Sequence, residues 1–181
     1  MKIGFTIESQ SAEIHVSIIS LDSFDAFDEM WEGTDEHQGG VTIKNPEATL
    51  GSWQYFVPRQ TSLSELASAY AAQGIHNASA EAYTSLQYQL ERDLCACDYS
   101  FRASVVVAGI EVVQDEYVGC CFSHSYLDDE DLETTARAVW DEYDCTAEVV
   151  SAAVDKVKEI IAAVPVLHTF VANPTGGNVC T

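Results

Sequence analysis

The chain has to fold against its own electric charge. Its 181 residues include 29 acidic and only eight basic ones, which gives a formal net charge of −21 at pH 7. A compact state with such an excess repels itself, and a small domain needs far less charge than this to remain soluble. A partner with a positive face, a high-salt environment or bound cations would offset the repulsion. The charge therefore indicates what this protein meets more than which reaction it runs.

The apolar content nevertheless predicts a folded protein. Hydrophobic residues make up 47% of the chain, and three Trp, eight Tyr and seven Phe supply large core side chains. A disordered acidic chain would contain fewer aromatic and β-branched residues. We expect one α+β domain over residues 1–165, with a boundary near residue 60 as the alternative. Residues 166–181 are expected to form a C-terminal strand or a flexible tail.

The periodicity of apolar residues changes several times along the chain. Alternation predicts strands, and these are expected at residues 3–7, 14–18, 41–43, 52–57, 101–107, 110–113 and 117–122. Spacing of three and four predicts helices, and these are expected at residues 21–32, 62–73, 79–95, 129–143 and 146–164. The helix at 62–73 is expected to open with a capping box at Ser62–Glu65, and the helix at 79–95 to carry an apolar stripe of Ala82, Leu86, Leu90 and Leu94. The order shows no regular βαβ rhythm, so the predicted class is α+β with a mixed or antiparallel sheet. The short joint near residue 144 predicts a C-terminal antiparallel helical hairpin.

The first concentration of negative charge falls in the helix expected at residues 21–32. Its acidic residues are spaced three or four apart, which would align them along one side beside an apolar stripe. No Lys or Arg lies between Lys2 and Lys44 to relieve their repulsion. The acidic residues of this segment are the expected first-rank partner contacts: Asp22, Asp25, Asp28, Glu29 and Glu32. Asp35 and Glu36 continue the patch into the loop and are expected partner contacts as well.

A second concentration surrounds the helix expected at residues 129–143. Carboxylates are favourable at its start, where the helix dipole is positive, but not at its end. These residues are the expected second-rank contacts: Asp128, Asp129, Glu130, Asp131, Glu133, Asp141, Glu142 and Asp144. The segment lacks the central Gly of a calcium-binding loop, so we expect no dedicated metal site and no cofactor.

Nothing in the sequence matches a known catalytic motif. The chain has no Gly-rich phosphate loop, nucleophile elbow or metalloprotease HExxH pattern. The five histidines are scattered singly, and a pair such as Cys121 and His124 has no specific spacing. His15 and His124 are expected to be ordinary surface or edge histidines. The six cysteines do not match a zinc or thioredoxin-like spacing and are interpreted as small apolar fillers: Cys95, Cys97, Cys120, Cys121, Cys145 and Cys180. We therefore expect no enzyme activity.

Sequence features also bear on location. No apolar run approaches the roughly 20 residues that span a bilayer, and the N-terminus lacks the apolar core of a secretory signal. A negative surface is also repelled by anionic lipid. We expect a cytoplasmic protein that does not bind membranes.

In size, charge and absence of catalytic motifs, the chain resembles the small acidic DNA-mimic inhibitors of restriction and CRISPR nucleases found in phages and mobile elements. The resemblance is to a class of proteins, and no family motif transfers residue roles to this sequence. It implies a basic partner that binds nucleic acid, while the negative field disfavours direct binding of nucleic acid. The alternatives are an acid-surfaced interaction module, a salt-adapted domain and a small intracellular enzyme of unknown reaction.

Overall fold

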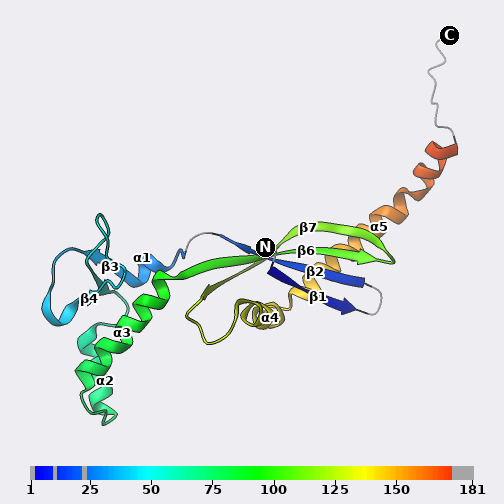
Figure 1. The fold of residues 1–181 in the computed structure, drawn as a ribbon. Helices are drawn as coiled ribbons and strands as arrows, with labels where there is room; N and C mark the ends of the chain where they lie inside the picture. The colour runs from blue at the N-terminus through cyan, green and yellow to red at the C-terminus, as the bar shows by residue number, and fades with distance from the viewer. Residues whose placement is uncertain (1–2, 10–11, 22–23, 173–181) are drawn as a thin grey trace. The chain divides into compact units, whose positions relative to one another are not determined.

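The computed structural model describes residues 3–9, 12–21 and 24–172 (Figure 1). The chain divides into two compact units. Unit 1 consists of residues 1–19, 100–121 and 136–181, and unit 2 consists of residues 20–99 and 122–135. The described residues contain five α-helices and antiparallel sheets, which confirms the α+β class. Residue 60 lies inside unit 2; the single domain over 1–165 and the alternative boundary stay predictions.

Unit 1 is built on a four-stranded sheet. Its strands lie in the order β1-β2-β6-β7 and comprise β1 (Ile3–Ser9), β2 (Ala12–Ser20), β6 (Ala96–Val107) and β7 (Ile110–Ser125). The last two are long, and their residues 96–99 and 122–125 belong to unit 2. β1 and β2 pair antiparallel from Ile3 opposite Ile18 to Ser9 opposite Ala12. The strands expected at residues 3–7 and 14–18 are therefore both present.

Two helices follow the sheet, α4 (Leu132–Glu142) and α5 (Cys145–Ala172). The indole of Trp140 is 1% exposed and receives the rings of Phe5 and Phe101 edge-on, at centroid distances of 5.8 and 5.3 Å. Its Nε1–H donates to Thr146 Oγ1 at 2.8 Å, so the buried polar atom has a partner. Trp140 thus joins α4, α5 and the strands in one core. An antiparallel hairpin arrangement of the two helices stays a prediction.

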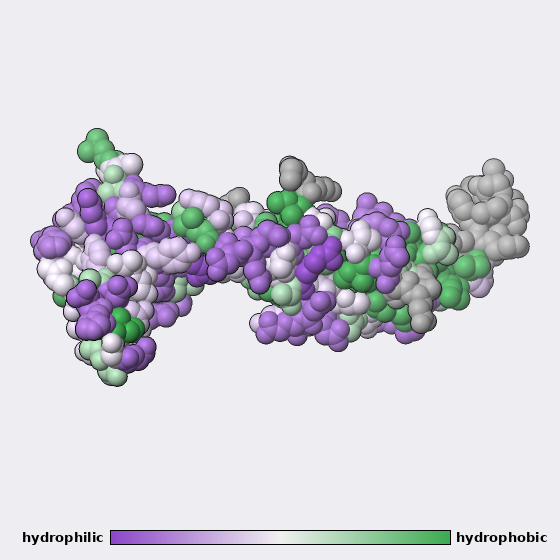
Figure 2. Space-filling view, turned by 60° about the horizontal axis from the view of Figure 1, so that its bottom comes forward, coloured by the Kyte–Doolittle hydropathy of each residue, from purple (hydrophilic) through white to green (hydrophobic). Residues whose placement is uncertain are grey.

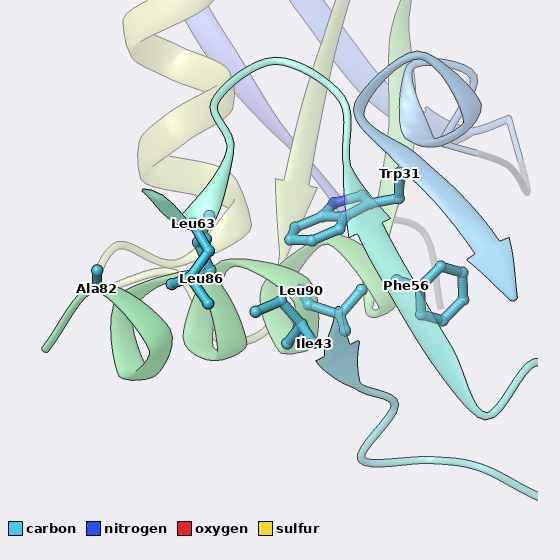
Figure 3. Packing of buried hydrophobic residues seen from close by; sticks show 7 residues of the cluster. All are labelled: Trp31, Ile43, Phe56, Leu63, Ala82, Leu86 and Leu90. Carbon is cyan, nitrogen blue, oxygen red and sulfur yellow. The ribbon is translucent and has the colours of Figure 1, made fainter. Parts of the chain in front are cut away.

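Unit 2 packs two helices against a small antiparallel sheet of order β3-β5-β4. Its elements are α1 (Phe27–Met30), β3 (Trp31–Thr34), the 3-10 turn η1 (Gly39–Val41), β4 (Ile43–Lys44), β5 (Tyr55–Pro58), α2 (Leu63–Ala72) and α3 (Ala78–Leu94). Figure 3 shows the core where Trp31, Ile43 and Phe56 meet the helices. The apolar stripe expected on α3 is buried at Ala82, Leu86 and Leu90, whereas its last member, Leu94, is half-buried.

The capping box expected at the start of α2 is also present. Ser62 Oγ accepts from the Glu65 amide at 3.3 Å, and Glu65 Oε2 accepts from the Ser62 amide at 2.9 Å. These two bonds satisfy backbone donors that the first helical turn leaves without partners. The helix therefore begins where the sequence predicts.

The helix expected at residues 21–32 is wrong. Among the described residues of this range only α1, four residues long, is an α-helix, and Trp31 starts strand β3 opposite Pro58. A row of like charges at helical spacing destabilises a helix, and short helices depend on tertiary packing. Here the packing favours the strand, because β3 pairs with β5 and the buried indole of Trp31 joins the core. Asp25 therefore precedes α1 and Glu32 lies in β3, so these carboxylates do not share one helix.

Within the C-terminal segment expected to be a strand or a flexible tail, residues 166–172 are helical, so that expectation is wrong there. Helix α5 continues through Pro165 and ends at Ala172. A short apolar run cannot be assigned to strand or helix from periodicity alone, and a proline usually ends a helix pattern. Here helix α5 extends on both sides of Pro165. Residues 173–181, the rest of the expected tail, lie outside the described residues.

None of the described helices is long and apolar enough to cross a bilayer.

The turn between β6 and β7 yields a stability prediction. Ala108 and Gly109 have φ angles of 51° and 80°, so both central residues of this two-residue hairpin loop are left-handed, as a type I′ turn requires. Alanine tolerates that conformation poorly, whereas Asn-Gly is a preferred pair. We expect Ala108→Asn to raise the free energy of unfolding by about 0.5–1 kcal/mol in urea denaturation.

The matched control is Gly109→Ala, which has open space around it but retains a positive φ. It is expected to lower the free energy of unfolding. A lower value for Ala108→Asn would contradict the turn conformation.

Candidate functional site

The negative charge is divided unequally between the two units. Unit 2 carries 18 acidic and three basic residues, whereas unit 1 carries 11 acidic and five basic residues. Unit 2 therefore has a net charge of −15, most of the excess of the whole chain. Two of its three bases, Arg59 and Arg92, form ion pairs with acids of the same unit. The candidate site is the acidic surface of unit 2.

Two chain segments supply this surface, and we call them acidic segment A, residues 25–36, and acidic segment B, residues 128–133. They lie nearly a hundred residues apart in sequence. The C-terminal end of α3 joins them. Trp31 of segment A donates from Nε1 to Asp93 Oδ2 at 2.9 Å, and Asp128 of segment B accepts a short hydrogen bond from Arg92 Nε.

Arg92 and Asp93 close the link between the two segments. The guanidinium of Arg92 lies 3.6 Å from Asp93 Oδ1 and also pairs with Asp128. Asp93 is 2% exposed, so its carboxylate depends on these partners in place of water. The Ser125 amide donates to Asp128 Oδ2 at 2.9 Å, and His124 Nδ1 lies 3.4 Å from the same oxygen. Asp128 is therefore a structural residue of the network.

Asp98 provides a second tie between the same parts of the chain. Its Oδ2 accepts from the Asp25 amide at 3.0 Å, and its Oδ1 accepts a short hydrogen bond from Ser123 Oγ. Its carbonyl accepts from the Leu21 amide at 2.8 Å. The start of segment A is thus bonded to β6, which is bonded in turn to the β7 end that leads into segment B.

The network shifts the pKa values of its carboxyl groups in opposite directions. Burial raises the pKa of Asp93, and the hydrogen bond from Trp31 only partly offsets that effect. Burial also acts to raise the pKa of Asp128, but the bonds from Arg92 and Ser125 outweigh it and hold that pKa below its usual value. Asp128 is therefore held ionised, as a counter-ion for Arg92.

Several predicted contacts have structural roles. Asp131 caps α4 by accepting from the Thr134 amide at 3.0 Å, which lowers the pKa of Asp131 and explains why the helix starts at Leu132. Glu32 lies 3.5 Å from Arg59, and Asp35 Oδ1 accepts from the Gln54 amide at 3.3 Å. These three side chains are exposed but already engaged.

Other predicted contacts are available to a partner. Asp28 and Glu29 in segment A and Asp129 and Glu130 in segment B are exposed, and none forms an ion pair within the described structure. We call these four residues the open carboxylates.

The remaining predicted contacts are divided among segment A, the first turn of α4 and unit 1. Asp25 and Glu36 are exposed in segment A, and Glu133 is half-buried in the first turn of α4. Asp141, Glu142 and Asp144 are exposed but belong to unit 1. Asp22 lies outside the described residues.

The residues that organise the site are not among the predicted contacts: Arg92, Asp93 and Asp98. One signal was present for Asp93. It follows Leu86 by seven residues and Leu90 by three, which places a carboxylate on the buried stripe of α3. A charge there requires a partner inside the protein.

The described cysteines lie in different environments: Cys120 and Cys145 are buried, as expected of apolar fillers, whereas Cys121 is exposed. Burial raises the pKa of the Cys145 thiol to about 11 and also raises that of Cys120, which makes both thiols inert. His15 is exposed, as expected. His124 lies in the edge strand β7, but its side chain is buried and does not lie on the surface. Among the described residues, no three His, Cys, Asp or Glu side chains gather as they would around a metal ion.

No protein-family model, characterised protein or solved structure matches this chain. Its function therefore has to be inferred from the chemistry of its surface.

The Arg92 network yields a stability prediction. Removing one partner from a fully buried ion pair costs about 3–5 kcal/mol, and the partial exposure of Arg92 reduces our expectation for Arg92→Met to about 2 kcal/mol. The loss arises because Asp93 and Asp128 keep their charges without a cation. Urea denaturation at pH 7 would measure it.

The matched control is Arg59→Met, whose partner Glu32 is exposed. That change should cost less than about 0.5 kcal/mol. Because the pKa of Asp128 is lowered in the folded state, its contribution is full above the ordinary Asp value and is lost as the pH falls through the folded-state pKa. The difference between wild type and Arg92→Met should shrink over that pH range. Equal costs for the two variants would show that the network carries no special stability.

Proposed function

We propose that this protein is a nucleic-acid decoy, which binds through unit 2 to the cationic nucleic-acid groove of a nuclease or another DNA-binding protein. It is not an enzyme, and its activity is to exclude nucleic acid from that groove. The observation that carries the proposal is the concentration of a net charge of −15 on one compact unit.

Duplex DNA presents one negative charge per roughly 1.7 Å of its axis, and its binding proteins meet it with grooves lined by Lys and Arg. A protein surface with closely spaced carboxylates attracts the same groove over a long range and displaces the same counter-ions. Segments A and B supply such carboxylates on neighbouring parts of unit 2, where only three basic residues oppose them.

A decoy also needs its charges held in place, because flexible carboxylates lose conformational entropy on binding. The Arg92 network and Asp98 supply this rigidity by bonding both acidic segments to α3 and β6. The carboxylates of segment A lie on a short helix, a strand and a loop, so an ordered helical row is no part of the mechanism.

The open carboxylates Asp28, Glu29, Asp129 and Glu130 become the first-rank contacts, since the structure already uses Asp128, Asp131 and Glu32. The proposal places the protein in the cytoplasm, where restriction and CRISPR nucleases meet DNA. Its class is the anti-restriction or anti-CRISPR inhibitors of phages and mobile elements. The competing function is a module for a basic partner that does not bind nucleic acid.

The test is a pull-down from bacterial lysate at low salt, followed by elution with double-stranded DNA. We expect a DNA-binding protein to be retained and then released by the DNA competitor. Asp28→Asn, Glu29→Gln, Asp129→Asn and Glu130→Gln combined should weaken binding to that protein at least about tenfold, because each lost charge pair removes favourable attraction. Titration of the purified target by fluorescence anisotropy would measure the change.

The matched control removes four exposed acidic charges from unit 1, at Glu8, Glu13, Glu111 and Glu116. It lowers the total charge equally, so binding should change less than about twofold if position matters more than amount. Equal weakening by both variants would contradict a defined surface on unit 2. A retained partner that DNA does not release would favour the competing interaction module.

A further inference from the structure

Helix α5 carries an apolar seam with the spacing of a helix–helix contact. Val150, Val154, Val157, Ile161 and Val164 follow one another at intervals of four, three, four and three residues. This is the a/d repeat by which two helices pack, and β-branched side chains are common at those positions. A seam of this kind normally faces another helix.

The protein itself leaves most of this seam uncovered. Val154 is 47% exposed, Ile161 64% and Val164 51%. The buried face of α5 adjoins the seam and includes Val149 and Ala153, both of which are buried. Figure 2 shows apolar residues, in green, along the end of unit 1 where α5 lies.

A groove extends the seam toward the sheet. It has a volume of about 280 Å³ and lies between β6, which contributes Val105 and Val107, and α5, which contributes Val150, Val154 and Val157. Its lining is almost entirely aliphatic, and Lys158 stands at its edge. Side chains entering from a partner helix would bury this surface together with the exposed seam.

The charge of this region indicates which partner fits. Residues 150–164 contain two acidic and two basic residues, and these pair within the helix: Lys156 with Glu159 at 2.9 Å and Lys158 with Asp155 at 2.8 Å. The segment is therefore neutral in a chain of net charge −21. Two copies of this chain repel one another over most of their surfaces, but they can meet here. A basic partner would instead be drawn to unit 2.

We propose that α5 pairs with α5 of a second copy of this chain to form an antiparallel homodimer along the 150–164 seam. In antiparallel packing the a and d positions alternate across the contact, which sets Val157 against Ile161 and Val154 against Val164 of the other copy. The two sheets, each packed on the first half of its own α5, then lie at opposite ends of the helix pair. This separation reduces the repulsion between the copies.

The exposed apolar side chains of α5 supply surface for such an interface. A specific contact needs at least about 1,000 Å² of total buried surface, and a two-fold contact uses each residue twice. Three large aliphatic side chains of the seam, Val154, Ile161 and Val164, are between 47% and 64% exposed on each copy, and the groove adds to their area.

The experiment measures the molar mass of the full chain by sedimentation equilibrium from 1 to 100 μM, chosen to span about micromolar to sub-millimolar affinities. We expect a monomer–dimer equilibrium in the wild type and at least about 30-fold weaker dimerisation in Ile161→Lys, the loss expected of a central interface residue. The added lysine lowers the net negative charge, so greater repulsion cannot explain that loss. Val164→Lys serves as the second variant and should behave alike.

The matched control is Ile110→Lys, because Ile110 has the same 64% exposure on the same unit but lies in β7. It should dimerise as the wild type does. A wild type that stays monomeric at 100 μM overturns the proposal, as does a dimer that survives both α5 substitutions. Circular dichroism spectra would confirm that both variants keep their helices.

Salt separates this proposal from the nucleic-acid decoy. Screening of the net charge should strengthen dimerisation of an apolar seam as ionic strength rises, whereas binding of unit 2 to a cationic groove should weaken. The test of dimerisation through α5 can therefore fail while the test of binding by unit 2 succeeds, and the reverse.

Discussion

The pairing of Arg92 with Asp93 and Asp128 is the interaction on which the acidic surface depends. Like charges drive the chain apart, and a cation placed between two carboxylates reverses that force at one point. Because Asp93 also holds the indole of Trp31, the same cation connects the core of unit 2 to both acidic segments. One arginine thus sets the positions of the carboxylates around it.

The two proposals describe two solutions to one electrostatic problem. On unit 2 the excess charge is concentrated where few bases oppose it, and a cationic partner would relieve it. On α5 the charges cancel in pairs inside the helix, which leaves an apolar seam that a second copy can cover without repulsion. A molecule divided in this way can bind a basic partner and itself through separate surfaces.

Local signals predicted a large part of the fold. Alternation placed β1 and β2, the Ser62–Glu65 capping box started α2, and a repeat of four placed the buried face of α3. Each of these depends on residues a few positions apart, and nothing more distant opposes them. At residues 21–32 the same helical spacing misled, because pairing of β3 with β5 and the like-charge row both act against a helix. The apolar run at residues 167–172 has no periodicity that distinguishes a strand from a helix.

Sequence alone determined the size of the negative charge, the α+β class and the identity of the acidic segments, because composition and local period record them directly. Only the tertiary structure decided which carboxylates are open and which serve as caps or counter-ions. That division rests on contacts such as Arg92 with Asp128 and Asp25 with Asp98, which join residues 36 and 73 positions apart. Such contacts form when the chain folds back on itself, and no short-range pattern encodes them.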